Sequence, residues 1–189
     1  MLRRDDLNTI LVLGSGPIKI GQAAEFDFSG SQAVRALRED GYEVILVNSN
    51  PATIQNDPEM ADRVYIEPLL PDTVRKILEI EKPDALLAGM GGQTALNIAS
   101  ELSHDGTLER LGVELIGSDL DAIDKAEDRE LFNQVCESID LPISQAIACN
   151  SMEEVIRAAE EIGSWPILIR PAFTLGGLGG GTAFDMGQL

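Results

Sequence analysis

The chain has 189 residues, 44% of them apolar, which is enough for the core of one domain of ordinary size and part of another. Its 32 acidic and 14 basic residues give a formal net charge of −18, which argues against nucleic acid or an anionic membrane as a general partner. A zinc site or a disulfide framework is disfavoured, because the chain has only two cysteines, without a CxxC spacing, and a single histidine. That histidine, His104, lies in a polar segment that predicts a surface loop. The start, MLRRDDLN, lacks the apolar region of a signal peptide, and no apolar run is long enough to span a membrane, so we expect a cytoplasmic protein.

The first 118 residues predict strands that alternate with helices. Buried strands are expected at residues 9–13, 43–47, 63–66, 85–88 and 114–116. Helical spacing of apolar residues follows the first, third and fourth strands, and this alternation predicts a parallel sheet covered on both faces. Glycines and asparagines follow the first, second and fourth strands, at the edge where open α/β sheets bind ligands. Residues 1–118 are therefore predicted to form a Rossmann-like α/β domain.

A second domain is predicted to begin at residue 119. Helical patterns at 123–126 and 131–139 precede an expected strand at 144–148. Ser151 and Glu154 have the spacing of a capping box, and the helix that they would open has one apolar face, formed by Met152, Val155, Ile156 and Ala159. A last strand, 166–170, leads into a glycine-rich loop. Residues 119–189 would thus be the beginning of a further domain.

The glycine-rich loop is the strongest candidate for a binding site. Five glycines fall between residues 176 and 181, and Arg170 ends the strand before them. Glycines allow successive backbone N–H groups to approach an anion, and a strand would hold the arginine as a fixed cation beside it. This combination favours a phosphate site. A flexible glycine-rich hairpin or linker behind a structural arginine is the alternative.

The other glycine turn does not have the pattern of a nucleotide site. In GSGPIKIG the third glycine, Gly21, follows the second by five residues, whereas the dinucleotide fingerprint requires three. Pro17 also has no backbone N–H, although its position should donate one. The second strand ends at Asn48 instead of an acidic residue, and no GKS or GKT of a P-loop occurs. Glu25 and Asp27 could serve acid–base or metal chemistry, but in so acidic a chain we expect them at a helix entry with their charges in water. Arg129 is expected in a surface ion pair.

Five motifs, in this order and spacing, closely resemble the amino-terminal end of the large subunit of carbamoyl phosphate synthetase: GSGPIKIGQAAEFDFSGSQA, VNSNPATIQNDPEMAD, MGGQTALN, AIDKAEDRELF and ILIRPAFTLGGLGGG. The resemblance covers nearly the whole chain. It implies a pre-ATP-grasp domain over residues 1–118 and the incomplete first subdomain of an ATP-grasp domain over residues 119–189. Other ATP-grasp ligases, such as a biotin carboxylase relative, share this domain order but should not reproduce AEFDFSGSQA or NPATIQNDPEMAD.

The resemblance also implies a reaction and a partner. The residues of the motifs resemble the first half of the large subunit, which makes carboxyphosphate from bicarbonate and ATP. Ammonia arrives from a glutaminase small subunit, carbamate forms, and the second half phosphorylates it with a second ATP, for arginine and pyrimidine biosynthesis.

Carried over by position, the resemblance makes Arg129 and Arg170 ligands of the ATP phosphates and puts the backbone of Gly176 and Gly177 against the nucleotide. Mg²⁺ or Mn²⁺ is implied, with K⁺ as a further candidate, and the metal ligands are expected beyond residue 189. We therefore expect the 189 residues alone to be inactive, and a structural or interaction module is the alternative function for them.

Overall fold

A computed structural model describes residues 3–16, 23–170 and 179–189, and it describes only the backbone of Ala23, Ala24 and Arg129. The chain divides into two compact units, Met1–Val135 and Cys136–Leu189, which we call unit 1 and unit 2 and describe separately. This division falls later in the chain than the domain boundary expected between residues 118 and 119, which stays a prediction.

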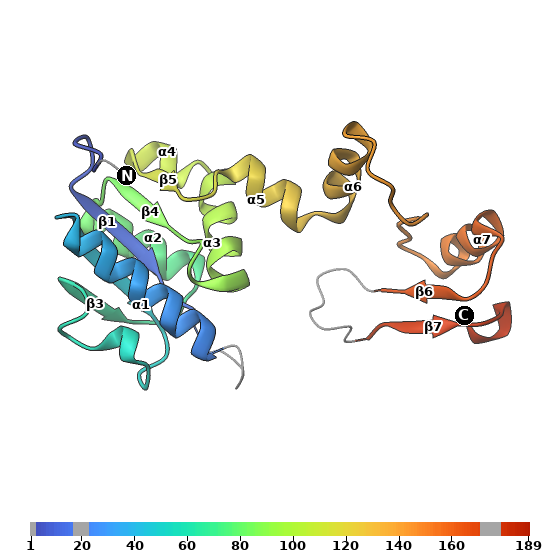
Figure 1. The fold of residues 1–189 in the computed structure, drawn as a ribbon, viewed down its shortest axis with the longest axis horizontal. Coiled ribbons are helices and arrows are strands. Elements are labelled where there is room, and N and C mark those ends of the chain that lie inside the picture. The colour runs from blue at the N-terminus through green and yellow to red at the C-terminus, as the bar shows by residue number, and fades with distance from the viewer. Residues whose placement is uncertain (1–2, 17–22, 171–178) are drawn as a thin grey trace. The chain divides into compact units, whose positions relative to one another are not determined.

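Unit 1 is built on a five-stranded sheet with the order β3-β2-β1-β4-β5, in which every pair of neighbours is parallel (Figure 1). The strands are β1 (Thr9–Leu13), β2 (Glu43–Asn48), β3 (Arg63–Ile66), β4 (Ala85–Leu87) and β5 (Glu114–Ile116). The expected parallel α/β sheet is confirmed. The chain moves outward from β1 to β3 and then returns to the other side of β1, so the strand order reverses between β1 and β4.

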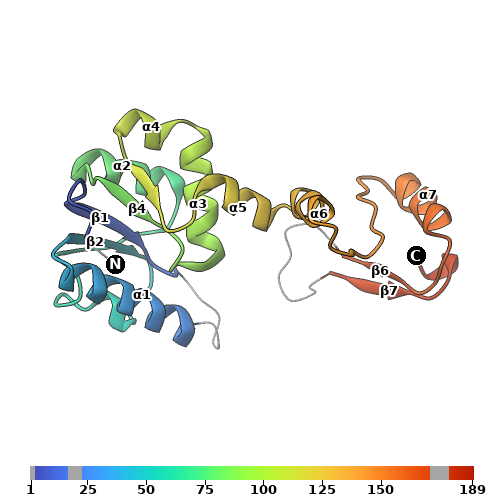
Figure 2. The same ribbon diagram turned by 45° about the horizontal axis from the view of Figure 1, so that its top comes forward.

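Helices cover both faces of this sheet, as Figures 1 and 2 show. On one face α1 (Ala23–Glu39) packs Val34 against Val12 and Leu46. The other face carries α2 (Pro71–Glu81), α3 (Gly92–His104) and α4 (Thr107–Leu111). The apolar residues that predicted α2 and α3 are all buried: Val74, Ile77, Leu78, Ala95, Ile98, Ala99 and Leu102.

Two shorter elements complete the regular structure of unit 1. The single-turn helix η1 (Ile54–Asn56) follows β2, and α5 (Leu120–Glu127) packs on α3. His104, which was expected in a loop, is the last residue of α3, and its Nε2 lies 3.1 Å from Oδ2 of Asp124 on α5. The helix continues through the polar segment because Leu102 on its inner face is still buried. Even α1, with 17 residues, is too short and too polar to cross a membrane, and the same holds for every other helix in the described ranges.

Unit 2 contains α7 (Met152–Ile162) and a hairpin of β6 (Ile167–Ile169) and β7 (Gly181–Ala183), followed by the short helix η2 (Met186–Gln188). The residues of α6 (Arg129–Ser138) belong partly to unit 1 and partly to unit 2. The predicted cap of α7 is present, since the Glu154 N–H donates to Ser151 Oγ at 3.3 Å. The Glu154 carboxylate in turn accepts from the N–H of Asn150, at 2.7 Å, one residue before the position that a capping box uses.

One sequence prediction in unit 2 is wrong, and another is right only in part. Residues 144–148 are irregular, because a strand needs a partner and the described strand β6 pairs with β7 instead. The face of α7 that was expected to be buried is buried only in part: Ala159 is buried and Val155 is half-buried, whereas Met152 is 57% exposed and Ile156 40% exposed. The helix packs through its alanines because their small side chains allow a close approach.

Candidate functional site

The carboxyl edge of the sheet in unit 1 is closed by a network of buried amides. Asn48, at the end of β2, accepts the N–H of Gly16 at 3.0 Å and donates through Nδ2 to Gln55 Oε1 at 3.1 Å. Gln55 is fully buried and donates through Nε2 to the carbonyl of Phe26 on α1, at 3.3 Å. The network therefore ties the turn after β1, the end of β2 and the first turns of α1 together.

Glycines provide the space that this network needs. A Cβ on Gly30 would lie 1.7 Å from Gln55 Nε2, and one on Gly14 would lie 2.6 Å from Asn48 Cγ. A Cβ on Gly91, after β4, would lie 2.5 Å from the carbonyl oxygen of Gly14. Backbone and amide groups thus pack closely together beside the carboxyl ends of β1, β2 and β4. Asn48 has a structural role there. The sequence had shown only that an asparagine stands where a dinucleotide fold usually has an acidic residue.

Several buried oxygens at the same edge have no hydrogen-bond partner among the described residues: Ser15 Oγ, Asp27 Oδ1, Ser31 Oγ, Ser49 Oγ and Asn56 Oδ1. Glu25 is exposed as expected, but Asp27 is only partly exposed. Apart from Asp27, the sequence had marked none of these residues, because unpartnered burial depends on contacts between segments that are distant in the chain.

The hairpin of unit 2 carries the predicted phosphate site. Its strands pair antiparallel, with Ile169 opposite Gly181, and Arg170 is the exposed residue that follows β6. Gly179, two residues before β7, has a φ of +71°, a left-handed conformation that favours glycine. Arg170 and Gly179 are thus the described residues on either side of residues 171–178, which lie outside the described part of the chain.

The remaining predicted site residues are only partly described. Arg129 is the first residue of α6, where the Asp128 carboxylate accepts the N–H groups of Glu130 and Leu131, at 2.8 Å and 3.0 Å. The Arg129 side chain, Gly176 and Gly177 lie outside the described residues. Within the described ranges, no cluster of three or more histidine, cysteine or acidic side chains could hold a metal ion.

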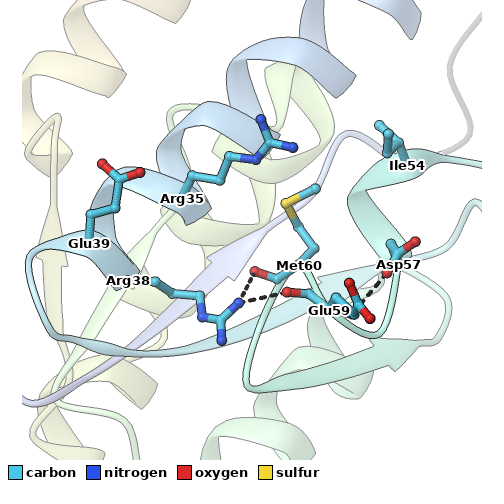
Figure 3. Close-up of a pocket in the computed structure, with 7 residues that line it drawn as sticks. All are labelled: Arg35, Arg38, Glu39, Ile54, Asp57, Glu59 and Met60. Atoms are coloured by element: carbon cyan, nitrogen blue, oxygen red, sulfur yellow. Dashed lines mark hydrogen bonds between the residues drawn. The ribbon is translucent and has the colours of Figure 1, made fainter.

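A shallow hollow of about 460 Å³ lies between α1 and the segment that follows η1 (Figure 3). The Nη1 group of Arg38 donates to the carbonyls of Glu59, at 2.6 Å, and Met60, at 3.1 Å, and so holds the segment against α1. Arg35 lies on the same side of the hollow, which is open and contains none of the predicted site residues.

Comparison with known proteins identifies the family. Residues 6–125 match the family model of the carbamoyl phosphate synthase preATP-grasp domain, and residues 128–189 match that of the carbamoyl-phosphate synthase L chain, ATP binding domain. The chain belongs to the carbamoyl phosphate synthase large-chain family. The resemblance inferred from the five motifs is thereby confirmed.

Curated members of this family are similar along almost the whole chain. The carbamoyl phosphate synthase large chain of Synechocystis sp. is 60% identical over 98% of this chain, and that of Archaeoglobus fulgidus is 59% identical over all of it. The N-terminal section of the large chain of Aquifex aeolicus is 58% identical over 98% of this chain. The chain spans only 17% and 18% of the first two relatives and 33% of the third.

Solved structures with a similar fold come from more distant proteins. The biotin carboxylase domain of 2-oxoglutarate carboxylase from Hydrogenobacter thermophilus superposes with a TM-score of 0.70 at 19% identity, over 98% of this chain and 39% of that one. N5-carboxyaminoimidazole synthetase from Staphylococcus aureus gives a TM-score of 0.60 at 13% identity, over 100% and 45% of the two chains. These likenesses support the fold, and the much higher identity to carbamoyl phosphate synthases argues against the biotin carboxylase alternative.

Proposed function

We propose that the chain is the N-terminal part of a carbamoyl phosphate synthase large chain and contributes to making carbamoyl phosphate from bicarbonate, glutamine-derived ammonia and two ATP. The observation that carries this proposal is the match of the two family models, one after the other, along nearly all of the chain. The larger protein would be a cytoplasmic ligase of arginine and pyrimidine biosynthesis, with a glutaminase small subunit as its partner.

The reaction assigned to this part is the phosphorylation of bicarbonate to carboxyphosphate. The motif sequences resemble those of the first half of the large subunit, and this resemblance supports the assignment. The 58% identity to a protein named as an N-terminal section also supports it. Within this proposal, residues 1–118 form the pre-ATP-grasp domain and residues 119–189 begin the ATP-grasp domain.

The proposed ATP ligands are Arg129, Arg170 and the backbone of Gly176 and Gly177. Phosphoryl transfer depends mainly on fixed cations and N–H donors placed around the phosphate oxygens, whose charge is redistributed in the transition state. The hairpin suits this chemistry because the pairing of Ile169 with Gly181 anchors the segment that bears these groups. A magnesium ion would neutralise phosphate charge, and the family resemblance implies that its ligands lie beyond residue 189.

Arg170→Ala in the full-length large chain tests the proposal. We expect bicarbonate-dependent ATP hydrolysis to fall by about 10²–10³-fold, since removing one such charge-stabilising donor typically has an effect of this size. The reverse of the second phosphorylation, ATP formation from carbamoyl phosphate and ADP, should be unchanged, because it belongs to the other half. The isolated 189 residues should hydrolyse no ATP in response to bicarbonate.

Arg157→Ala is the matched control, because Arg157 is also an exposed arginine of unit 2 but lies on α7. It should leave both reactions unchanged. Normal bicarbonate-dependent hydrolysis in the Arg170 variant would contradict the role of Arg170. Loss of the carbamoyl phosphate reaction alone would instead assign the chain to the second half.

A further inference from the structure

We propose that Asp124 is a positioning residue for Arg129: through α5 it fixes where the backbone of Arg129 lies relative to the sheet of unit 1. The inference rests on the proposed function, in which Arg129 is one of the ATP ligands. It concerns unit 1 by itself, since both residues and the contacts described below belong to residues 1–135.

The carboxylate of Asp124 connects α5 to α3, which lies beside it (Figures 1 and 2). Its Oδ1 accepts the hydroxyl of Ser100 at 3.1 Å, and its Oδ2 lies 3.1 Å from Nε2 of His104, four residues further along α3. Residues four apart lie on the same face of a helix, so one carboxylate bridges successive turns of α3. Contacts at two points restrict both sliding and rotation of α5.

Little else in α5 itself is buried. Ile123 is its buried residue, and most of its other side chains are exposed. The ion pair between Asp121 and Lys125 lies within the helix and does not connect it to α3. A single apolar anchor leaves a helix free to pivot about it, and the carboxylate of Asp124, next to that anchor, opposes the pivot.

A movement of α5 would be passed on to Arg129, because only Asp128 separates α5 from α6. The Asp128 N–H donates to the carbonyl of Asp124 at 2.9 Å, so Asp124 is bonded to α3 through its side chain and to this junction through its backbone. The Asp128 carboxylate in turn accepts the N–H groups of Glu130 and Leu131. These bonds leave the junction little freedom, so the first residue of α6 follows the end of α5.

The position of an ATP ligand matters for phosphoryl transfer. Fixed cations stabilise the transition state only where they are already in place, and a displacement of about 1 Å can lower a rate by about 10²-fold. Asp124 would therefore affect the reaction through Arg129, without a contact of its own to ATP.

A double-mutant cycle in the full-length large chain tests the inference. Bicarbonate-dependent ATP hydrolysis is measured for the wild type, Asp124→Ala, Arg129→Ala and the double variant. We expect kcat/KM for ATP to fall by about tenfold to 10²-fold in Asp124→Ala and by about 10²–10³-fold in Arg129→Ala. The double variant should be no worse than Arg129→Ala, because Asp124 acts through Arg129. A merely structural role of Asp124 would instead make the two losses multiply.

Two further variants separate position from stability. Asp124→Asn keeps the shape of the side chain and an acceptor for Ser100, so it should restore most of the activity that Asp124→Ala loses. Asp121→Ala is the matched control on the same helix and should be as active as the wild type. ATP formation from carbamoyl phosphate and ADP should be unchanged throughout, which verifies that each variant is folded. If Asp124→Ala does not fold, Ser100→Ala carries the same cycle, because it removes one of the two contacts with α3.

The outcomes distinguish this inference from the proposed function. Losses that multiply in the double variant, full activity of Asp124→Ala beside a loss in Arg129→Ala, or an equal loss in Asp121→Ala would overturn the inference and leave the proposed function standing. Normal activity of Arg129→Ala would remove Arg129 from the proposed ATP ligands and overturn the inference with it.

Discussion

Gln55 is the residue on which the carboxyl edge of unit 1 depends. It bridges Asn48 and the carbonyl of Phe26, and it fits only because Gly30, in the middle of α1, has no side chain. Alanine at a helical glycine normally stabilises a helix by about 1 kcal/mol. At Gly30 the new methyl group would overlap Gln55, so steric conflict should outweigh helix propensity.

Gly30→Ala should therefore destabilise the chain by about 1–3 kcal/mol, the usual range for overpacking. The free energy of unfolding in urea measures the effect. Gly89→Ala is the matched control, because a Cβ there would have no atom within 4 Å. A Gly30 variant as stable as the Gly89 variant would mean that Gln55 moves aside freely and that the amide network is not tightly packed.

At the scale of elements, α5 is held to α3 through one carboxylate. Asp124 accepts the hydroxyl of Ser100 at 3.1 Å through Oδ1, and its Oδ2 lies 3.1 Å from His104 Nε2. Ile123 beside it is the buried residue of α5, so this apolar side chain and the two polar contacts of Asp124 connect α5 with the rest of unit 1. A short helix with so few contacts should be sensitive to the loss of either.

Asp124→Ala should loosen α5, at a cost of roughly 0.5–1.5 kcal/mol for each hydrogen bond lost. Hydrogen exchange of the amides of residues 120–127 should become faster while the strands keep their protection. Asp121→Ala on the same helix is the control, because the carboxylate of Asp121 pairs only with the exposed Lys125 four residues later. Equal exchange rates in the two variants would show that Ile123 alone holds the helix.

At the scale of the whole molecule, the units differ in how much apolar surface they bury. In the described part of unit 2 the buried apolar residues are Cys136, Ala158, Ala159 and Ala183. Many of its large apolar side chains are exposed, including Trp165, Leu168 and Phe184. Because burial of apolar surface is the main stabilising contribution, unit 2 by itself should be only marginally stable.

We therefore expect unit 2 to unfold before unit 1 in the 189-residue chain. Amides of α7 should exchange more than about tenfold faster than those of β1 and β2, after correction for intrinsic rates. A urea titration followed by Trp165 fluorescence should have an earlier midpoint than one followed by helical circular dichroism. Coincident midpoints and equal protection would mean that the chain unfolds as one cooperative unit.

Much of unit 1 could be predicted from the sequence alone. The bounds of β1, β3 and β5 agree with those expected, because short apolar runs between turn residues specify strands locally. The buried faces of α2 and α3 follow from a spacing of three and four residues. The family follows from motifs whose order and spacing are a property of the sequence itself.

Tertiary structure decided the features that depend on which segments meet. Residues 144–148 have the composition of a strand but no described partner, and Met152 has an apolar spacing but no described surface to cover it. The bridge made by Gln55 arises from contacts between distant segments. Periodicity reports what a segment can bury, whereas its neighbours in space determine what it does bury.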